Sequence, residues 1–344
     1  MEKNISIPNS QGQNEKIKLQ LIKSIVNAPY IQYIKVNSFC SFKSINNTLY
    51  LIYSTSNISI IFYDLMNDQN INQIKRAHKK FITNIRHCLD NYHKRDLVIT
   101  VSLDDNNIKL WNATDCQNLL NIENINKKGG ILSAFFLNDY DKKQIFIISS
   151  NQSLNEIEPI KLYNLEGKEV RRINNSNYSV YYIDTYYDMK NNKKYIIACN
   201  NSCIRSYDYD NNEIYRIYSE NKKINSIAHI YLVINNKEEM IELCEDGKIR
   251  IWSFHTAQLL IVIDIGRFYE ILCFSFIDEQ NILIGCRDKL IKSVNLKDRK
   301  IIDNFKGHNN EVNYITIINH NKYGKILISQ GWKEDGIRIW KIIE

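Results

Sequence analysis

The sequence predicts an all-β fold: a seven-bladed β-propeller of four-stranded antiparallel blades, closed by an N-terminal strand that completes the last blade. Three observations predict this fold. A tetrapeptide recurs at a nearly constant interval, an apolar pair opens each interval, and four short strand-like segments fill it. A repeat of about 40–45 residues is typical of propeller blades.

The tetrapeptide begins with Ile, usually has a basic residue next, and usually ends with an aromatic residue. Its last residues are separated by 42 to 52 positions along the chain. The seven copies are Ile60–Tyr63, Ile108–Trp111, Ile160–Tyr163, Ile204–Tyr207, Ile249–Trp252, Ile291–Val294 and Ile337–Trp340. We expect each copy to form the third strand of its unit.

The other segments of each unit also favour β-strands. An apolar pair three residues apart opens each unit, such as Ile82 with Ile85 in the second. An apolar run such as Leu97–Val101 follows, and a further run such as Gln258–Ile263 comes after the tetrapeptide. Ile- and Tyr-rich segments bounded by Asn, Asp, Lys and Gly are typical of strands, and strands covered on both faces are apolar on both. Two separate sandwich domains are the alternative, but they do not explain why the tetrapeptides and the apolar pairs keep the same spacing along the whole chain.

The ends of the chain predict how the ring closes. The last tetrapeptide ends at Trp340, so the seventh unit lacks a fourth strand. The segment 16–22 alternates apolar and polar residues, as a strand does. We expect it to supply the missing strand and so remove a free sheet edge. The predicted domains are a flexible tail, 1–15, and the propeller, 16–344.

Charge and cysteine content limit the kinds of partner and the cellular compartment that fit the sequence. The net charge is +7, which is compatible with an acidic or nucleic-acid partner, although most charges are scattered as on solvated loops. Lys75–Lys80 is the densest positive run. The eight cysteines form no Cys-x-x-Cys pair, which favours reduced thiols of an intracellular protein. We expect a cytoplasmic rather than a nuclear location. The first 16 residues show no secretory signal, and no apolar run is long enough to span a membrane.

Two units carry a resemblance to a known family. The seventh reads Gly307-His308 and later Asp335-Gly336-Ile337-Arg338-Ile339-Trp340, and the second has Ala77-His78, Asp105 and Trp111. These residues resemble the WD-repeat family, over about residues 16–344. The opening His is missing from units one, three, four, five and six, and the Trp-Asp dipeptide is absent.

The resemblance implies a structural hydrogen-bond network in which a His, a Ser or Thr, a turn Asp and a Trp bind one another. Carried over, the network residues are His78, Ser102, Asp105 and Trp111; Asp246 and Trp252; and His308, Ser329, Asp335 and Trp340. Buried polar groups need such partners, so this role is structural.

No motif for catalysis is visible. The chain has no phosphate-cradling Gly-rich loop, nucleophile elbow or His-Glu-x-x-His motif, so we expect no enzyme activity, catalytic residue, cofactor or metal. Three further patterns are more typical of loops and strands than of sites: a zinc site at His87, Asp90 and His93, a redox pair of Cys199 and Cys203, and a phosphoinositide motif at Arg171-Arg172.

The expected function is a non-catalytic protein–protein interaction scaffold within an intracellular multiprotein complex. In the WD-repeat family partners often dock on the rim formed by the loops between blades and the turns between second and third strands. The hypothesis places the partner on the loop rim of blades six and seven, at Arg267, Phe268, Tyr269, Arg287 and Trp332. The alternative is an RNA- or ribonucleoprotein-associated subunit that uses basic rim loops. An enzyme with a site in the central channel and a membrane-lipid binder are the lesser alternatives.

Overall fold

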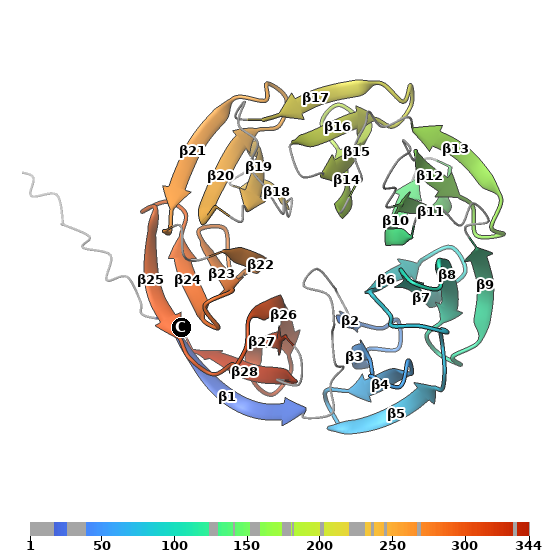
Figure 1. Ribbon diagram of the computed structural model, residues 1–344, viewed down its shortest axis with the longest axis horizontal. Helices are drawn as coiled ribbons and strands as arrows, with labels where there is room; N and C mark the ends of the chain where they lie inside the picture. Colours follow the sequence, from blue (N-terminus) through green and yellow to red (C-terminus); the bar gives the residue numbers. More distant parts are fainter. Residues whose placement is uncertain are drawn as a thin grey trace, which may run out of the picture.

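The computed structural model describes residues 17–25, 39–123, 130–139, 142–151, 159–173, 180, 182–199, 203–219, 231–234, 237–243, 246–266, 270–332 and 336–343. Over these ranges the chain forms seven four-stranded antiparallel sheets arranged around a common axis (Figure 1). The predicted seven-bladed propeller is therefore confirmed. No helix that could cross a membrane occurs in the described ranges. The predicted tail, 1–15, lies outside them.

The blades follow one another along the chain, and in each the strands run from the axis outward. Blade 1 contains β2 (Phe39–Lys43), β3 (Leu49–Ser54), β4 (Ile60–Asp64) and β5 (Gln69–Ile74). Blade 2 contains β6 (Asn84–Asp90), β7 (Arg95–Ser102), β8 (Asn107–Asn112) and β9 (Asn118–Glu123). Blade 3 contains β10 (Ile131–Asp139), β11 (Gln144–Asn151), β12 (Ile160–Tyr163) and β13 (Glu169–Ile173). Blade 4 contains β14 (Tyr182–Asp188), β15 (Lys193–Cys199), β16 (Ile204–Asp208) and β17 (Ile214–Tyr218).

The remaining blades repeat the plan, and the last one takes its outer strand from the other end of the chain. Blade 5 contains β18 (Tyr231–Ile234), β19 (Lys237–Leu243), β20 (Lys248–Ser253) and β21 (Leu259–Asp264). Blade 6 contains β22 (Ile271–Phe276), β23 (Asn281–Cys286), β24 (Ile291–Asn295) and β25 (Lys300–Phe305). Blade 7 contains β26 (Val312–His320), β27 (Gly324–Gly331), β28 (Ile337–Ile343) and β1 (Lys18–Ile25).

The pairing of β1 with β28 closes the ring. Lys18 lies opposite Ile343 and Ile25 opposite Ile337, and the two strands lie side by side in Figure 1. The predicted closing strand is confirmed, and it extends three residues beyond the predicted end at Ile22. Because the strand covers the free edge of β28, blade 7 has the same four strands as the others.

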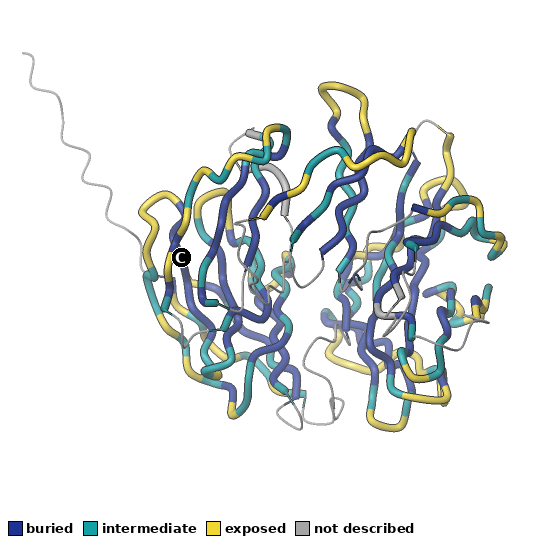
Figure 2. Tube along the Cα trace, turned by 45° about the horizontal axis from the view of Figure 1, so that its top comes forward, coloured by how far each residue is buried: buried dark blue, intermediate teal, exposed yellow. Residues whose placement is uncertain are grey.

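The core lies between the blades. Seven apolar clusters of described residues each join two neighbouring blades, including the closing pair, blades 7 and 1. Phe39 of blade 1 and Ile326 of blade 7, for example, are fully buried in one cluster. The strands are therefore buried on both faces, while exposed residues gather in turns and outer strands (Figure 2). This explains why the strands lack a simple apolar–polar alternation.

A bulge recurs beside the last residue of each tetrapeptide. The register between third and fourth strands shifts at Tyr63, Trp111 and Trp252, among others, and in blade 7 the shift lies opposite Trp340. Such bulges twist the outer strand. Because the strands are antiparallel, the first–second and third–fourth turns share one rim, here called the turn rim. The second–third turns and the inter-blade loops share the opposite rim, here called the loop rim.

Candidate binding rim

A buried network holds the loop between blades 1 and 2. His78 Nδ1 lies 3.0 Å from Asp105 Oδ2, and His78 Nε2 lies 2.8 Å from the Thr100 hydroxyl. Trp111 Nε1 donates to the same hydroxyl at 2.8 Å. Burial acts to raise the pKa of Asp105, but the hydrogen bond and charge of His78 outweigh it and lower that pKa. The hydroxyl of this network belongs to Thr100, which corrects the prediction of Ser102. Ser102 lies two residues further along β7 and is only the last of the groups that lower the Asp105 pKa.

Blade 7 repeats this arrangement. His308 Nε2 lies 2.7 Å from the Ser329 hydroxyl, and Trp340 Nε1 donates to that hydroxyl at 2.7 Å. The hydroxyl precedes the Trp by eleven residues in both blades. That spacing is the sequence signal that selects Thr100 over Ser102. Asp335, the predicted fourth member, lies outside the described residues.

Blade 5 uses a different set of polar partners. Trp252 Nε1 donates to Glu242 Oε2 at 2.7 Å, and the turn residue Asp246 binds Arg250 at 2.7 Å. Arg250 is only 1% exposed, so its charge needs this partner. In blade 6, Asp288 and the buried Lys292 form the same pair at 2.7 Å. The basic residue of the tetrapeptide therefore takes the place of the missing His at the turn Asp.

Hydrogen bonds from both blades fix the loop that carries His78. The Lys79 amide donates to Asp105 Oδ2 at 2.9 Å, and the Lys109 ammonium donates to the Ala77 carbonyl at 2.6 Å. The Ala77 amide donates to the Ile58 carbonyl of blade 1 at 2.9 Å. Ala77 and His78 are both buried. The centre of this loop is therefore anchored, and the residues on either side of it stay at the surface.

Four cations surround a cavity beside this loop. Lys75, Arg76, Lys79 and Lys80 are all exposed, and they line a cavity of about 710 Å³. Its other walls are 56–59, Gln73 and Phe81, so no acidic side chain lines it. Within the described ranges none of the four cations forms an ion pair. We call these four residues with Phe81 the basic loop. Its fixed positive charges attract anionic groups.

The predicted patch on blades 6 and 7 is described only in part. Arg267, Phe268 and Tyr269 lie outside the described residues. Arg287 pairs with the Glu270 carboxylate and lies 3.3 Å from Glu311 Oε1, so two carboxylates neutralise its charge.

Trp332 also contacts Glu311, through a backbone hydrogen bond. Its amide donates to the Glu311 carbonyl at 2.7 Å, and its side chain is half-buried. The structure therefore brings Arg287 and Trp332 together through Glu311. In place of a free cation beside an aromatic ring, this part of the loop rim offers a neutralised arginine and a partly exposed Trp.

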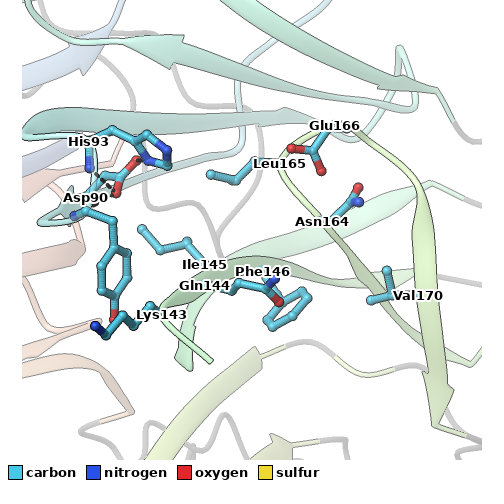
Figure 3. A pocket seen from close by; sticks show the side chains of 11 residues that line it. Asp90, His93, Lys143, Gln144, Ile145, Phe146, Asn164, Leu165, Glu166 and Val170 are labelled. Carbon is cyan, nitrogen blue, oxygen red and sulfur yellow. Dashed lines mark hydrogen bonds and ion pairs between the residues drawn. The ribbon is translucent and has the colours of Figure 1, made fainter. Parts of the chain in front are cut away.

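The turn rim carries a smaller cavity, of about 490 Å³, between blades 2 and 3. Figure 3 shows Asp90 and His93 on one side of it and Asn164 and Glu166 on the other. His93 Nδ1 lies 2.8 Å from Asp90 Oδ2, whereas His87 Nε2 lies 2.7 Å from Asp96 Oδ1. The two histidines thus contact different carboxylates, and the zinc site considered from their spacing does not assemble.

Burial holds several of the described thiols in the protonated state. Burial raises the pKa of Cys40 and Cys286 to about 12 and that of Cys88 and Cys116 to about 11. Since the thiolate is the reactive form of cysteine, these side chains act as packing groups at neutral pH.

One carboxyl on an innermost strand has a shifted pKa. Asp184 lies on β14, the innermost strand of blade 4 (Figure 1). Burial raises its pKa to about 7, although a hydrogen bond from the Thr185 amide and the charge of Arg86 act against the increase. Among the described residues, Asp184 does not belong to a group of acidic and histidine side chains that could bind a metal ion.

Comparison with known proteins adds no relative: no family model and no curated protein matches the chain. The sheet order, the closure by β1 and the seven inter-blade clusters together identify it as a seven-bladed β-propeller.

Proposed function

We propose that the protein is a non-catalytic interaction scaffold of the WD-repeat type, which binds a protein partner on its loop rim within an intracellular complex. The observation that carries the proposal is the basic loop, which presents four exposed cations around a cavity while its centre is anchored by His78 and Ala77. A loop that is already ordered loses little conformational entropy when a partner binds.

The networks of blades 2 and 7 support the WD-repeat type. In each, a His and a Trp share one hydroxyl, and the hydroxyl and Trp are eleven residues apart. The Asp–cation pairs of blades 5 and 6 replace the His without changing the blade. The resemblance to the WD-repeat family therefore rests on two blades. Blades 5 and 6 show that the same fold forms without the His-containing network.

The chemistry of the basic loop favours a partner with an acidic surface. Complementary charge speeds association and selects against basic partners. Phe81 adds an apolar surface at the edge of the cavity. Trp332, with Arg267, Phe268, Tyr269 and Arg287, remains the second proposed contact on this rim, and Trp residues are common anchors of protein interfaces.

Affinity capture with the full chain tests the scaffold. The variant Lys79→Ser/Lys80→Ser removes two cations of the basic loop, and the matched control Lys168→Ser/Lys297→Ser removes two exposed cations from turns on the turn rim. We expect the first variant to lose a protein that the wild type and the control both retain, with an unchanged melting temperature. Equal recovery of every captured protein by both variants would contradict the proposal.

The second candidate function is RNA binding, and the basic loop is the observation that favours it. Cations beside an aromatic side chain are a typical surface for single-stranded nucleic acid. Nuclease treatment before capture separates the two functions. A scaffold keeps its protein partner after the treatment, whereas an RNA-associated subunit loses it and shows a steep dependence of binding on salt.

A further inference from the structure

Three polar side chains meet on the turn rim at the junction of blades 4 and 5, away from the loop rim. Asp188 ends β14, Glu238 lies on β19, and His255 lies in the turn between β20 and β21. One ligand atom from each lies within 4.8 Å of the others. The three residues come from separate segments of the chain, so no sequence motif predicts that they lie together.

The equivalent positions in the preceding blades show what is unusual here. Asp90 and Asp139 also end the first strands of their blades, and both are buried. Asp90 pairs with Arg95 at 3.0 Å, and Asp139 pairs with the buried ammonium of Lys194. Within the described ranges, Asp188 pairs with no Lys or Arg and faces a second carboxylate, Glu238, across an imidazole.

The imidazole is held by a further residue. Tyr215 Oη lies 2.8 Å from His255 Nδ1, a hydrogen-bond distance that fixes the orientation of the imidazole ring. Nε2 lies 2.5 Å from Glu238 Oε2 and 3.7 Å from Asp188 Oδ2. This atom is buried and has no hydrogen-bond partner among the described residues. A cation between the imidazole nitrogen and the two carboxylates would give all three groups a partner.

Hydrogen bonds also fix the orientation of the Asp188 carboxylate. Asp188 Oδ1 accepts a hydrogen bond from the Asn191 backbone amide at 3.0 Å, and Asp188 Oδ2 accepts one from the Asn191 side-chain amide at 2.7 Å. Two carboxylates thus face one imidazole nitrogen, which is the donor arrangement of a metal site.

We propose that Asp188, Glu238 and His255 bind a divalent transition-metal ion, with Zn²⁺ the best match to one imidazole nitrogen and two carboxylate oxygens. Tyr215 is then the outer group that orients the histidine ligand, as is usual at such sites. Three protein ligands leave the remaining coordination positions to water. The ion joins blade 4 to blade 5 and replaces the Lys and Arg partners that the equivalent aspartates have.

The experiment is a Zn²⁺ titration of the full chain against a chromophoric chelator. We expect one ion per chain, loss of that ion in His255→Ala, and affinity at least about tenfold weaker in the nearly isosteric Glu238→Gln. The matched control is His93→Ala, which removes a histidine beside Asp90, where Arg95 already supplies the cation. This control should bind Zn²⁺ as the wild type does. Where His255→Ala fails to fold by circular dichroism, Glu238→Gln carries the test.

Cysteine ligands are the competing explanation for any bound ion, and Co²⁺ substitution separates the two. Nitrogen and oxygen ligands give a visible spectrum without the intense thiolate-to-metal band in the near ultraviolet. The expected result is a spectrum without that band, lost in His255→Ala. A thiolate band, an unchanged affinity in folded His255→Ala or Glu238→Gln, or no Zn²⁺ uptake by the wild type would each overturn the proposal.

Discussion

The His78 imidazole and the Thr100 hydroxyl lie 2.8 Å apart in the buried junction of blades 1 and 2. His78 belongs to the inter-blade loop and Thr100 to β7, so this contact ties the loop rim to the second strand of blade 2. The hydroxyl also accepts from Trp111 at 2.8 Å. Thr100 is therefore the shared point of the network, since its hydroxyl contacts the imidazole and accepts from the indole.

Replacing Thr100 tests this role. Thr100→Val keeps the shape of the side chain but leaves the imidazole and the indole N–H without their buried partner, so we expect a loss of about 1–3 kcal/mol in the free energy of unfolding. Ser102→Ala is the matched control and should cost less, because Ser102 lies outside the His–Trp contact. Urea unfolding of both variants measures the difference. Equal losses of stability in the two variants would contradict the assignment to Thr100 and favour Ser102, the residue predicted from the sequence.

Asp184 predicts a pH dependence of stability. Its pKa is raised to about 7 in the folded chain, above the usual value of about 4 in an unfolded one. The folded state therefore holds this proton more tightly, and the carboxyl costs stability as pH rises from about 4 to about 7. We expect Asp184→Asn to melt a few degrees higher than the wild type at pH 8 and at the same temperature at pH 4. A gain that does not depend on pH would exclude titration of Asp184 as the cause.

Ring closure predicts a sharp difference between two truncations. Removing residues 1–25 deletes β1 and exposes the edge of β28, so we expect aggregation and a lower melting temperature. Removing residues 1–15 leaves every described residue of β1 in place and should change neither. Light scattering and thermal melting check both chains. A monomeric, equally stable chain without β1 would show that the pairing contributes little.

Arg287 predicts a local cost when its charge is removed. Arg287→Gln leaves Glu270 and Glu311 facing each other without a cation between them. Because the group is partly exposed, we expect a loss of only about 1 kcal/mol in the free energy of unfolding, and a smaller loss in high salt. Trp332→Ala should leave stability nearly unchanged and reduce partner capture. The reverse pattern would assign Trp332 to packing and Arg287 to binding.

The sequence predicted the fold because each blade repeats a local pattern. The tetrapeptides mark the third strands, and the alternation before Ile22 marks the closing strand. Period and alternation are properties of adjacent residues, so they are visible without the structure. The choice of Ser102 failed because Thr100 and Ser102 lie on the same face of one strand, and only the spacing shared with Ser329 and Trp340 separates them.

The sites were harder to predict because their partners are distant along the chain. Arg287 is neutralised by glutamates from two different loops, Glu270 and Glu311, which strand pairing alone does not reveal. His255 meets Asp188 only because blades 4 and 5 pack together. The basic loop was visible as a run of charges, but its anchored centre depends on Asp105 and Ile58, which belong to different blades.

The most direct test of the scaffold measures how capture by the basic loop depends on salt. A protein retained by the wild type is bound again by purified wild type and by Lys79→Ser/Lys80→Ser, at low and at high ionic strength. Because screening removes the contribution of exposed charges, the account predicts roughly tenfold weaker binding by the variant at low salt and a smaller difference at high salt. Equal affinity of the two chains at low salt would contradict it.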